Sequence, residues 1–209
     1  MSNTSNKRLP RGPYKSGLLT QKSIIDAAIE LLMDSGYHNF SLRKVALRVG
    51  ISGGNLQHHF KSKQELTVAM LDTLISAYLV EFQTISNANH SPIVRLRKIL
   101  EHVIIDLNTR ATTVIFPELW SLANHDKRVS ASVDDMYERY RAVLKTCITE
   151  INPTLNPTQV EKMALFICAS LEGHTMFIGY NKKWTHHTES IVEMAFQSFL
   201  HMIEEGNIH

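Results

Sequence analysis

The sequence SLRKVALRVGISGGNLQHHF, residues 41–60, decides the fold of the N-terminal part of this chain. Its first half places apolar residues at helical spacing, namely Leu42, Val45, Ala46 and Val49. Ser41 can cap the start of this helix and Gly50 its end, and Ser52 can cap a second short helix that ends near Phe60. The stretch therefore predicts two short helices joined by a tight turn, which is the helix-turn-helix arrangement.

The predicted second helix carries polar side chains that are free to face outward: Asn55, Gln57, His58 and His59. Asparagine and glutamine can make two hydrogen bonds to adenine, and histidine can donate to guanine or to a phosphate. The basic residues near this helix suit phosphate contacts and are Arg43, Lys44, Arg48, Lys61 and Lys63. Together these residues predict a helix that reads bases in the major groove of DNA. The alternative is an ordinary pair of helices with a solvated surface.

Charge is distributed unevenly along the chain, although the net charge is only +2. Residues 1–63 carry ten lysines and arginines against three acidic residues, a net charge of +7. Residues 64–209 carry twelve against seventeen, a net charge of −5. This asymmetry favours a polyanion as the partner of the N-terminal end. Within that end, residues 1–17 are expected to form a basic arm, which either follows the DNA or is a flexible tail that adds non-specific attraction.

Apolar residues recur with the period of a helix along nearly the whole chain, and no strand-like alternation extends beyond a few residues. The predicted fold class is therefore all-α, with about nine helices. Besides the two helices above, we expect helices at about residues 19–35, 62–85, 91–107, 114–124, 130–151, 157–179 and 187–205. Ser62 and Glu65 are expected to form a capping box at the start of the long helix.

Several kinds of protein are excluded by what the sequence lacks. No run approaches about 18 uninterrupted apolar residues and the N-terminus is polar and basic, so we expect no membrane-spanning helix, no secretory signal and a cytoplasmic location. Cys147 and Cys168 lie in apolar helical patterns and are expected to be buried, although two thiols could pair. Adjacent histidines point to different helix faces, so no metal is expected. No catalytic pair, phosphate loop or nucleophile elbow is present, which predicts neither an enzyme nor a cofactor.

Residues 18–78 resemble the DNA-binding region of the TetR family of bacterial regulators. The resemblance runs from an apolar first helix through Gly36 and SLRKVA (residues 41–46) to GISGGNL (50–56) and HFKSKQEL (59–66). A helix-turn-helix alone is a weak signal, whereas its continuation into the long helix makes the combination specific. The resemblance implies three parts, which are the arm at 1–17, the DNA-binding domain at 18–78 and a helical effector-binding and dimerisation domain at 79–209.

The resemblance also implies which residues touch DNA. The phosphate contacts of the family map onto Ser41, Ser52 and Lys63, and its base contacts map onto Gly53, Asn55, Gln57 and His58. With the basic residues and the last histidine, the candidate DNA-binding residues are Ser41, Arg43, Lys44, Ser52, Gly53, Asn55, Gln57, His58, His59 and Lys63. Many family members carry tyrosine where this chain has Gln57, so the operator sequence stays open.

No strong chemical motif marks residues 87–209, but aromatic and polar residues mix on segments that could line a cavity. The candidates for an effector pocket are Phe116, Trp120, Glu172, His174 and Phe177. This mixture suits ligand pockets, which are mostly apolar with a few polar anchors. The alternative is that these residues are core aromatics and exposed acids. Glu172 could pair with a cationic effector or simply face water.

The last two predicted helices, at about 157–179 and 187–205, carry broad apolar faces that favour pairing with a second copy of the chain. The family resemblance implies the same homodimer, and burial within the monomer is the alternative. We expect a repressor that a small-molecule effector releases from operator DNA, with the helix at 62–85 as the moving element. The alternative is a DNA-bound adaptor with a protein partner and no effector. A closed apolar cavity would favour the effector, and an exposed apolar patch the adaptor.

Overall fold

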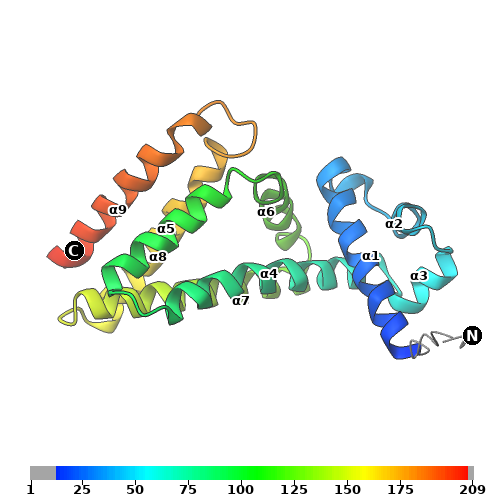
Figure 1. Ribbon diagram of the computed structural model, residues 1–209, viewed down its shortest axis with the longest axis horizontal. Helices are drawn as coiled ribbons and strands as arrows, with labels where there is room; N and C mark the ends of the chain where they lie inside the picture. The colour runs from blue at the N-terminus through cyan, green and yellow to red at the C-terminus, as the bar shows by residue number, and fades with distance from the viewer. Residues whose placement is uncertain (1–12, 207–209) are drawn as a thin grey trace, which may run out of the picture. The chain divides into compact units, whose positions relative to one another are not determined.

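The computed structural model describes residues 13–206, which form helices joined by short connections (Figure 1). Within that range, nine α-helices and three short 3₁₀ helices confirm the predicted all-α class. The α-helices are α1 (Pro13–Ser35), α2 (Leu42–Val49), α3 (Gly53–His59), α4 (Lys63–Asn87), α5 (Pro92–Asp106), α6 (Arg110–Ala123), α7 (Lys127–Ile151), α8 (Pro157–Gly173) and α9 (Thr188–Glu205). The 3₁₀ helices cover Tyr37–Asn39, His174–Met176 and Thr185–His187.

The chain divides into two compact units between Met70 and Leu71, inside α4. Unit 1 holds α1, α2, α3 and the start of α4, and unit 2 holds the rest of α4 and α5 to α9. The boundary expected from the sequence, residue 78, falls later along the same helix. One continuous helix therefore contributes residues to both units.

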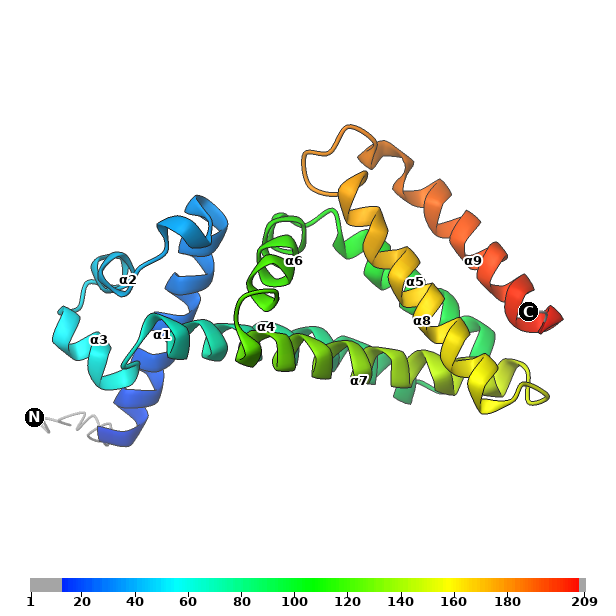
Figure 2. The ribbon, with the colours of Figure 1, turned by 180° about the vertical axis from the view of Figure 1, so that it is seen from behind.

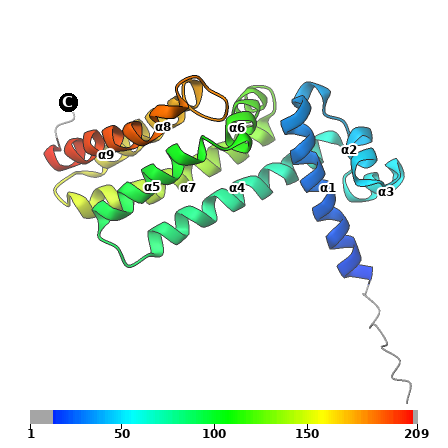
Figure 3. The ribbon, with the colours of Figure 1, turned by 45° about the horizontal axis from the view of Figure 1, so that its top comes forward.

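Unit 1 is a small helical domain with its own core. α1 packs against α2, and α2 packs against α3, so that α2 and α3 lie on the same side of α1 (Figure 3). An ion pair of 2.6 Å between Arg48 of α2 and Asp34 of α1 joins the first two helices. The buried residues of this core include Ile24, Ala28, Leu32, Phe40, Val45, Leu56, Phe60, Leu66 and Met70.

The turn between α2 and α3 forms as the sequence predicts. Ser41 Oγ accepts a hydrogen bond from the Lys44 amide at 3.3 Å, and Ser52 Oγ accepts one from the Asn55 amide at 3.1 Å. Gly50 ends α2 in the left-handed conformation, with φ of 75°. Residues with a Cβ adopt this conformation only at a cost in free energy, so glycine is the residue that the turn requires.

α1 begins earlier than predicted, at Pro13 and not at residue 19. Residues 13–17, which were expected in the basic arm, are therefore helical. Proline suits the first position of a helix because the N–H that it lacks would have no partner there. The rest of the expected arm, residues 1–12, lies outside the described residues.

The start of α4 differs in one hydrogen bond from the predicted capping box. Ser62 Oγ accepts from the Glu65 amide at 3.1 Å, as expected. The Glu65 carboxylate accepts from the Lys61 amide at 2.8 Å, one residue before the amide that the box requires. The connection after α3 is short, and the Lys61 N–H is one of the free donors that it leaves.

α4 is long and apolar enough to cross a membrane by length and composition alone, which the sequence analysis did not expect. Its apolar side chains are used in packing, because Leu66 and Met70 are buried in unit 1 and Leu71, Leu79 and Phe82 in unit 2. The core helix of a globular protein meets the same criterion. We attribute the apolar character of α4 to this packing.

Unit 2 is a helical bundle in which α5, α7, α8 and α9 share one core (Figure 2). α5 packs against α7 and α9, and α7 packs against α6 and α8. Cys147 and Cys168 are both free and buried in this core, as predicted. The largest side chains of the core include Phe82, Leu100, Tyr140, Leu144, Ile167, Leu171, Phe196 and Phe199.

α8 ends at Gly173, whereas the sequence predicted a helix to residue 179. The backbone after α8 is held instead by the connection between α5 and α6, since the Tyr180 amide donates to the Leu107 carbonyl at 3.1 Å. At Gly179, where φ is 141°, a Cβ would lie only 2.6 Å from Thr113 Oγ1. This contact between distant parts of the chain replaces the last turns of the predicted helix.

The left-handed conformation of Gly50 predicts that alanine is less well tolerated there than at Gly54. We expect Gly50→Ala to lower the free energy of unfolding by about 1 kcal/mol, because alanine is strained at this φ. Gly54→Ala is the control, since Gly54 lies inside α3 with open space around its Cα, and it should leave stability unchanged or raise it. Urea unfolding of the two variants would measure both effects. Equal stability of the two variants would contradict the role given to Gly50.

Candidate nucleic-acid interface and ligand cavity

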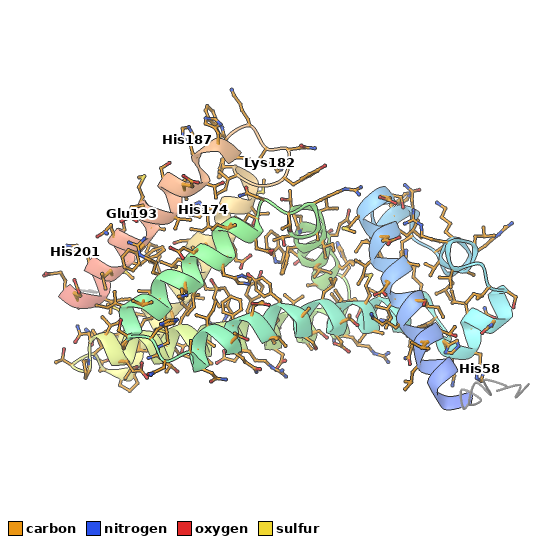
Figure 4. The ribbon with its side chains drawn as sticks, in the orientation of Figure 1. His58, His174, Lys182, His187, Glu193 and His201 are labelled. Carbon is orange, nitrogen blue, oxygen red and sulfur yellow. The ribbon has the colours of Figure 1, made fainter. Side chains whose placement is uncertain are left out.

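α3 presents a row of exposed polar side chains. Asn55, Gln57 and His58 are exposed, whereas Leu56 between them is fully buried and holds the helix on unit 1. Gly53 and Gly54 are exposed in the first turn of the helix, where the absence of side chains lets another molecule approach the backbone. Figure 4 labels His58 near the end of this helix. The side chains predicted to read bases therefore share one exposed helix surface.

The start of α2 and the turn bring further predicted contacts to the same region. Arg43 and Lys44 are exposed on α2, and Ser41 and Ser52 are each engaged in capping a helix. A groove of about 370 Å³ between α2 and α3 is lined by Leu42, Arg43, Ala46, Leu47, Ile51, Ser52, Gly53 and Gln57. His59 is only half-exposed, and its ring meets that of His58 at 5.6 Å. The structure thus gathers most of the predicted DNA-binding residues on one side of unit 1.

Two of the basic residues near α3 make contacts with other residues of unit 1. The Lys63 ammonium donates to the Tyr37 carbonyl at 3.0 Å and lies 3.7 Å from the centre of the Tyr37 ring. Burial lowers the pKa of Lys63 from its ordinary value. Arg48 is paired with Asp34 and Glu30. These two cations therefore hold parts of unit 1 together, a use that the local sequence pattern does not reveal.

Leu47 is a residue of this surface that the sequence analysis missed. It lies on α2 beside the groove that contains Gln57, and 71% of its side chain is exposed. The signal was present in the sequence, because Leu47 is two residues from Val45 and thus out of phase with the buried face of the helix. An exposed apolar side chain can contact the methyl group of thymine.

Lys61 and Lys63 provide a matched pair for testing which lysine serves DNA. Lys63→Met should lower the free energy of unfolding by about 1 kcal/mol, because the Tyr37 carbonyl loses a charged donor. Lys61→Met should leave stability unchanged, since its side chain is exposed, and should lower DNA affinity with a smaller salt slope. Thermal unfolding and DNA binding at several salt concentrations would measure these effects. The assignment would be wrong if Lys63→Met changed DNA affinity alone.

Unit 2 contains a cavity of about 330 Å³ between α4, α5 and α6. Its lining is mostly apolar, with a few polar side chains among them, and this is the composition of most small-molecule sites. The lining residues are Leu74, Ile75, Ala77, Tyr78, Glu81, His102, Asp106, Ala111, Thr112, Ile115, Phe116 and Leu119.

Aromatic rings surround Tyr78, which lines this cavity. The centre of the Tyr78 ring lies 5.0 Å from that of Phe82, 5.6 Å from that of His102 and 5.6 Å from that of Phe116. The Nε2 atom of His102 and the hydroxyl of Tyr140 are buried and have no hydrogen-bond partner among the described residues. Buried polar atoms of this kind are usually satisfied, and His102 also lines the cavity, so its Nε2 atom marks a place where a ligand could complete the hydrogen bonding.

A hydrogen-bonded chain connects α6, α7 and α8 beside the cavity. The Trp120 indole N–H donates to the Tyr137 hydroxyl at 2.8 Å, and this hydroxyl hydrogen-bonds the Glu172 carboxylate. Burial raises the pKa of Glu172 to about 7, and the hydrogen bond from Tyr137 offsets only part of that effect. Burial also raises the pKa of Tyr78, and the charges of Glu172 and Asp106 raise it further, which places both carboxylates within electrostatic reach of the cavity.

Only some of the residues predicted for the effector pocket lie at the cavity. Phe116 lines the cavity, and Trp120 and Glu172 lie beside it, joined through Tyr137. Half-buried His174 lies just after the end of α8, outside the cavity lining (Figure 4). Phe177 also lies outside the lining and is 64% exposed, because α8 ends before it. Among residues 13–206, no three acidic, histidine or cysteine side chains are grouped to hold a metal ion.

The raised pKa of Glu172 predicts a pH dependence of stability. Between about pH 4.5 and pH 7 the folded protein keeps a proton on Glu172 that the unfolded chain has lost, so stability should fall as pH rises through this window. Glu172→Gln should remove this dependence and gain about 1–2 kcal/mol relative to the unsubstituted protein above pH 7. Urea unfolding at several pH values would measure the difference. The control is Glu189→Gln, an exposed position on α9 that should follow the original curve, and parallel curves for all three proteins would contradict the assignment.

Comparison with known proteins identifies both units. Residues 24–70 match the family model of bacterial regulatory proteins of the tetR family, and residues 92–201 match that of the BetI-type transcriptional repressor, C-terminal. An uncharacterised HTH-type transcriptional regulator in the 5′ region of dhlA, from Xanthobacter autotrophicus, is 27% identical over 170 residues, which are 78% of each chain.

Solved structures share the fold at low sequence identity. A transcriptional regulator from Saccharomonospora viridis in complex with choline superimposes with a TM-score of 0.71 and 18% identity, over 90% of this chain and 96% of that one. The transcriptional regulator FadR from Bacillus subtilis in complex with stearoyl-CoA superimposes with a TM-score of 0.66 and 16% identity, over 90% of this chain and 99% of that one. At these identities the likeness concerns the fold.

Proposed function

Because the chain belongs to the TetR family and carries a BetI-type C-terminal domain, we propose that it is a cytoplasmic transcriptional repressor that binds operator DNA as a homodimer. A small-molecule effector bound in the cavity of unit 2 releases it from the DNA. The observation that carries this proposal is the exposed surface of α3, on which Asn55, Gln57 and His58 stand free while Leu56 anchors the helix.

The chemistry of this surface supports base reading. The amides of Asn55 and Gln57 can each make two hydrogen bonds to a base edge, whereas Arg43, Lys44 and Lys61 can contact phosphates on either side. A single helix of this length reads only a few base pairs. Two copies across a two-fold axis would read a palindrome with half-sites about 34–36 Å apart.

The outer faces of α8 and α9 support the homodimer. Large apolar side chains remain exposed there, with 54% of Leu165, 57% of Phe166 and 68% of Met194 accessible in the single chain. Exposed apolar surface of this extent on neighbouring elements is typical of an interface. Pairing of α8 and α9 with the same helices of a second copy would cover these residues.

The cavity of unit 2 supports an effector over a protein partner. Its volume of about 330 Å³ and its mostly apolar lining suit a small molecule. The two related structures hold different ligands, since choline is a cation and stearoyl-CoA carries several negative charges. The fold therefore permits an effector but does not select its class.

Selection of bound sequences from random duplex DNA tests the proposal. The full chain should enrich a palindrome, and the double variant Gln57→Ala, His58→Ala should lose or change it, because the base contacts are removed while the fold is kept. The control is Asn124→Ala, His125→Ala, which removes one amide and one imidazole from exposed positions in unit 2. It should enrich the original palindrome.

The outcomes separate the candidate functions. Enrichment of a palindrome that depends on the α3 side chains supports a dimeric sequence reader and supplies the operator for tests with ligands. Binding that follows only the salt concentration, with no enriched sequence, would contradict sequence reading by α3 and favour the adaptor.

A further inference from the structure

Leu47 is an apolar side chain that the packing of the protein leaves uncovered. It is more exposed than Leu165, Phe166 and Met194, the residues of the proposed dimer face. Those three residues belong to unit 2, whereas Leu47 belongs to unit 1, so the pairing of α8 and α9 gives no reason for an apolar residue on α2. Single exposed leucines are common on protein surfaces, and the meaning of this one depends on what lies beside it.

Leu47 forms part of an apolar groove and is not an isolated side chain. The groove between α2 and α3, of about 370 Å³, takes most of its lining from apolar residues of α2 and of the turn, namely Leu42, Ala46, Leu47 and Ile51. Gly53 lines the groove at the start of α3, where a Cβ would have no other atom within 4 Å. The groove is therefore apolar within and open at the end that α3 borders.

The packing of α2 fixes the direction of Leu47. Val45 and Ala46, the two residues before it, are buried in unit 1. Arg48, the residue after it, is held by Asp34 of α1 at 2.6 Å. A rotation of α2 that buried Leu47 would expose Val45 and Ala46 and break this ion pair, so Leu47 is held at the surface.

Polar and charged side chains at the groove relate it to the predicted DNA contacts. Gln57, a predicted base contact of α3, lines the same groove as Leu47. Arg43 also lines it, and both Arg43 and Lys44 are exposed and suited to phosphates. A base edge that Gln57 bonds would therefore lie at the opening of the groove, with positive charge beside it.

The chemistry of the major groove limits what an apolar groove can recognise there. Base edges present hydrogen-bond donors and acceptors, and the methyl group of thymine is the apolar group among them. The sugar is the other source of apolar contacts, but it carries no sequence information. An apolar groove beside an amide that bonds a base edge therefore fits a thymine methyl group.

We propose that Leu47 and the groove between α2 and α3 read the methyl group of a thymine beside the base that Gln57 bonds. The inference rests on the proposed function, in which α3 reads operator DNA. It adds a specificity residue from α2 and a base that each half-site must contain. Since glutamine bonds adenine, Gln57 and Leu47 together favour an A·T pair at this place in the operator.

Removal of single methyl groups from the selected palindrome tests the inference. Deoxyuridine keeps the hydrogen-bonding edge of thymine and lacks only its methyl group, so it replaces the thymines one symmetric pair at a time. Fluorescence anisotropy with the full chain measures the affinity for each duplex. At one pair we expect a loss of about fourfold for one half-site and about fifteenfold for both, which is the effect of leaving one methyl group unburied in each.

Variants connect this thymine to Leu47. Leu47→Ala should bind the thymine and the deoxyuridine palindromes equally, because the side chain that contacts the methyl group is gone. The variant should keep its fold, since Leu47 is exposed and alanine favours a helix. The control is Val80→Ala, which removes an exposed apolar side chain from α4 in unit 2 and should keep the full loss on methyl removal. Selection with Leu47→Ala should lose the preference for thymine at this position alone.

The outcomes separate this inference from the proposed function. A palindrome at which no methyl removal lowers the affinity, or lowers it equally in Leu47→Ala, would overturn the inference and leave sequence reading by α3 in place. Weaker binding of Leu47→Ala to every duplex, with the same loss on methyl removal, would indicate a contact with the sugar and also overturn it. If the unsubstituted chain enriched no palindrome, the proposed function would fail, and the inference with it.

Discussion

The burial of Leu56 is the constraint on which the DNA-facing surface depends. A helix as short as α3 does not persist in water by itself, because too few hydrogen bonds oppose the loss of backbone freedom. Leu56 and the following Phe60 lie in the core of unit 1, and Ser52 caps the helix start. Since so few residues hold α3 on unit 1, the other side chains of this helix are not needed for packing in the core. Polar residues at the exposed positions of α3 therefore need not stabilise the fold.

Unit 2 shows the opposite arrangement, in which polar groups remain where they cost stability. An apolar residue in place of Glu172 would not carry the cost of burying a carboxylate, and the buried Nε2 atom of His102 has no partner among the described residues. Folded proteins keep such unfavourable groups mainly where function requires them. The hydrogen bond from Trp120 to Tyr137 shows that the surroundings of Glu172 are ordered by neighbouring helices. The cost is therefore concentrated at one place beside a cavity.

The accuracy of the sequence predictions follows the range of the interactions that decide each feature. The caps at Ser41, Gly50 and Ser52 depend on neighbours within a few residues, so the short helices of unit 1 could be predicted. The end of α8 could not, because it is set by the Tyr180 amide reaching the Leu107 carbonyl, far away in the sequence. The use of Lys63 against Tyr37 and the place of Tyr137 between Trp120 and Glu172 are equally non-local. The sequence pattern predicts that these residues lie on helices, but it does not predict their contacts with residues far away in the sequence.

α4 is the helix that carries residues of both units. Its first turns carry Leu66 and Met70 of the unit 1 core, and its later turns carry Leu74 and Tyr78 of the cavity lining. We infer that a ligand against Tyr78 acts on the same helix that anchors the DNA-binding unit. The ligand can change DNA affinity only by the difference in its own affinity for the two states of the protein. The size of the response is therefore limited by how differently the cavity lining contacts the ligand in the two states.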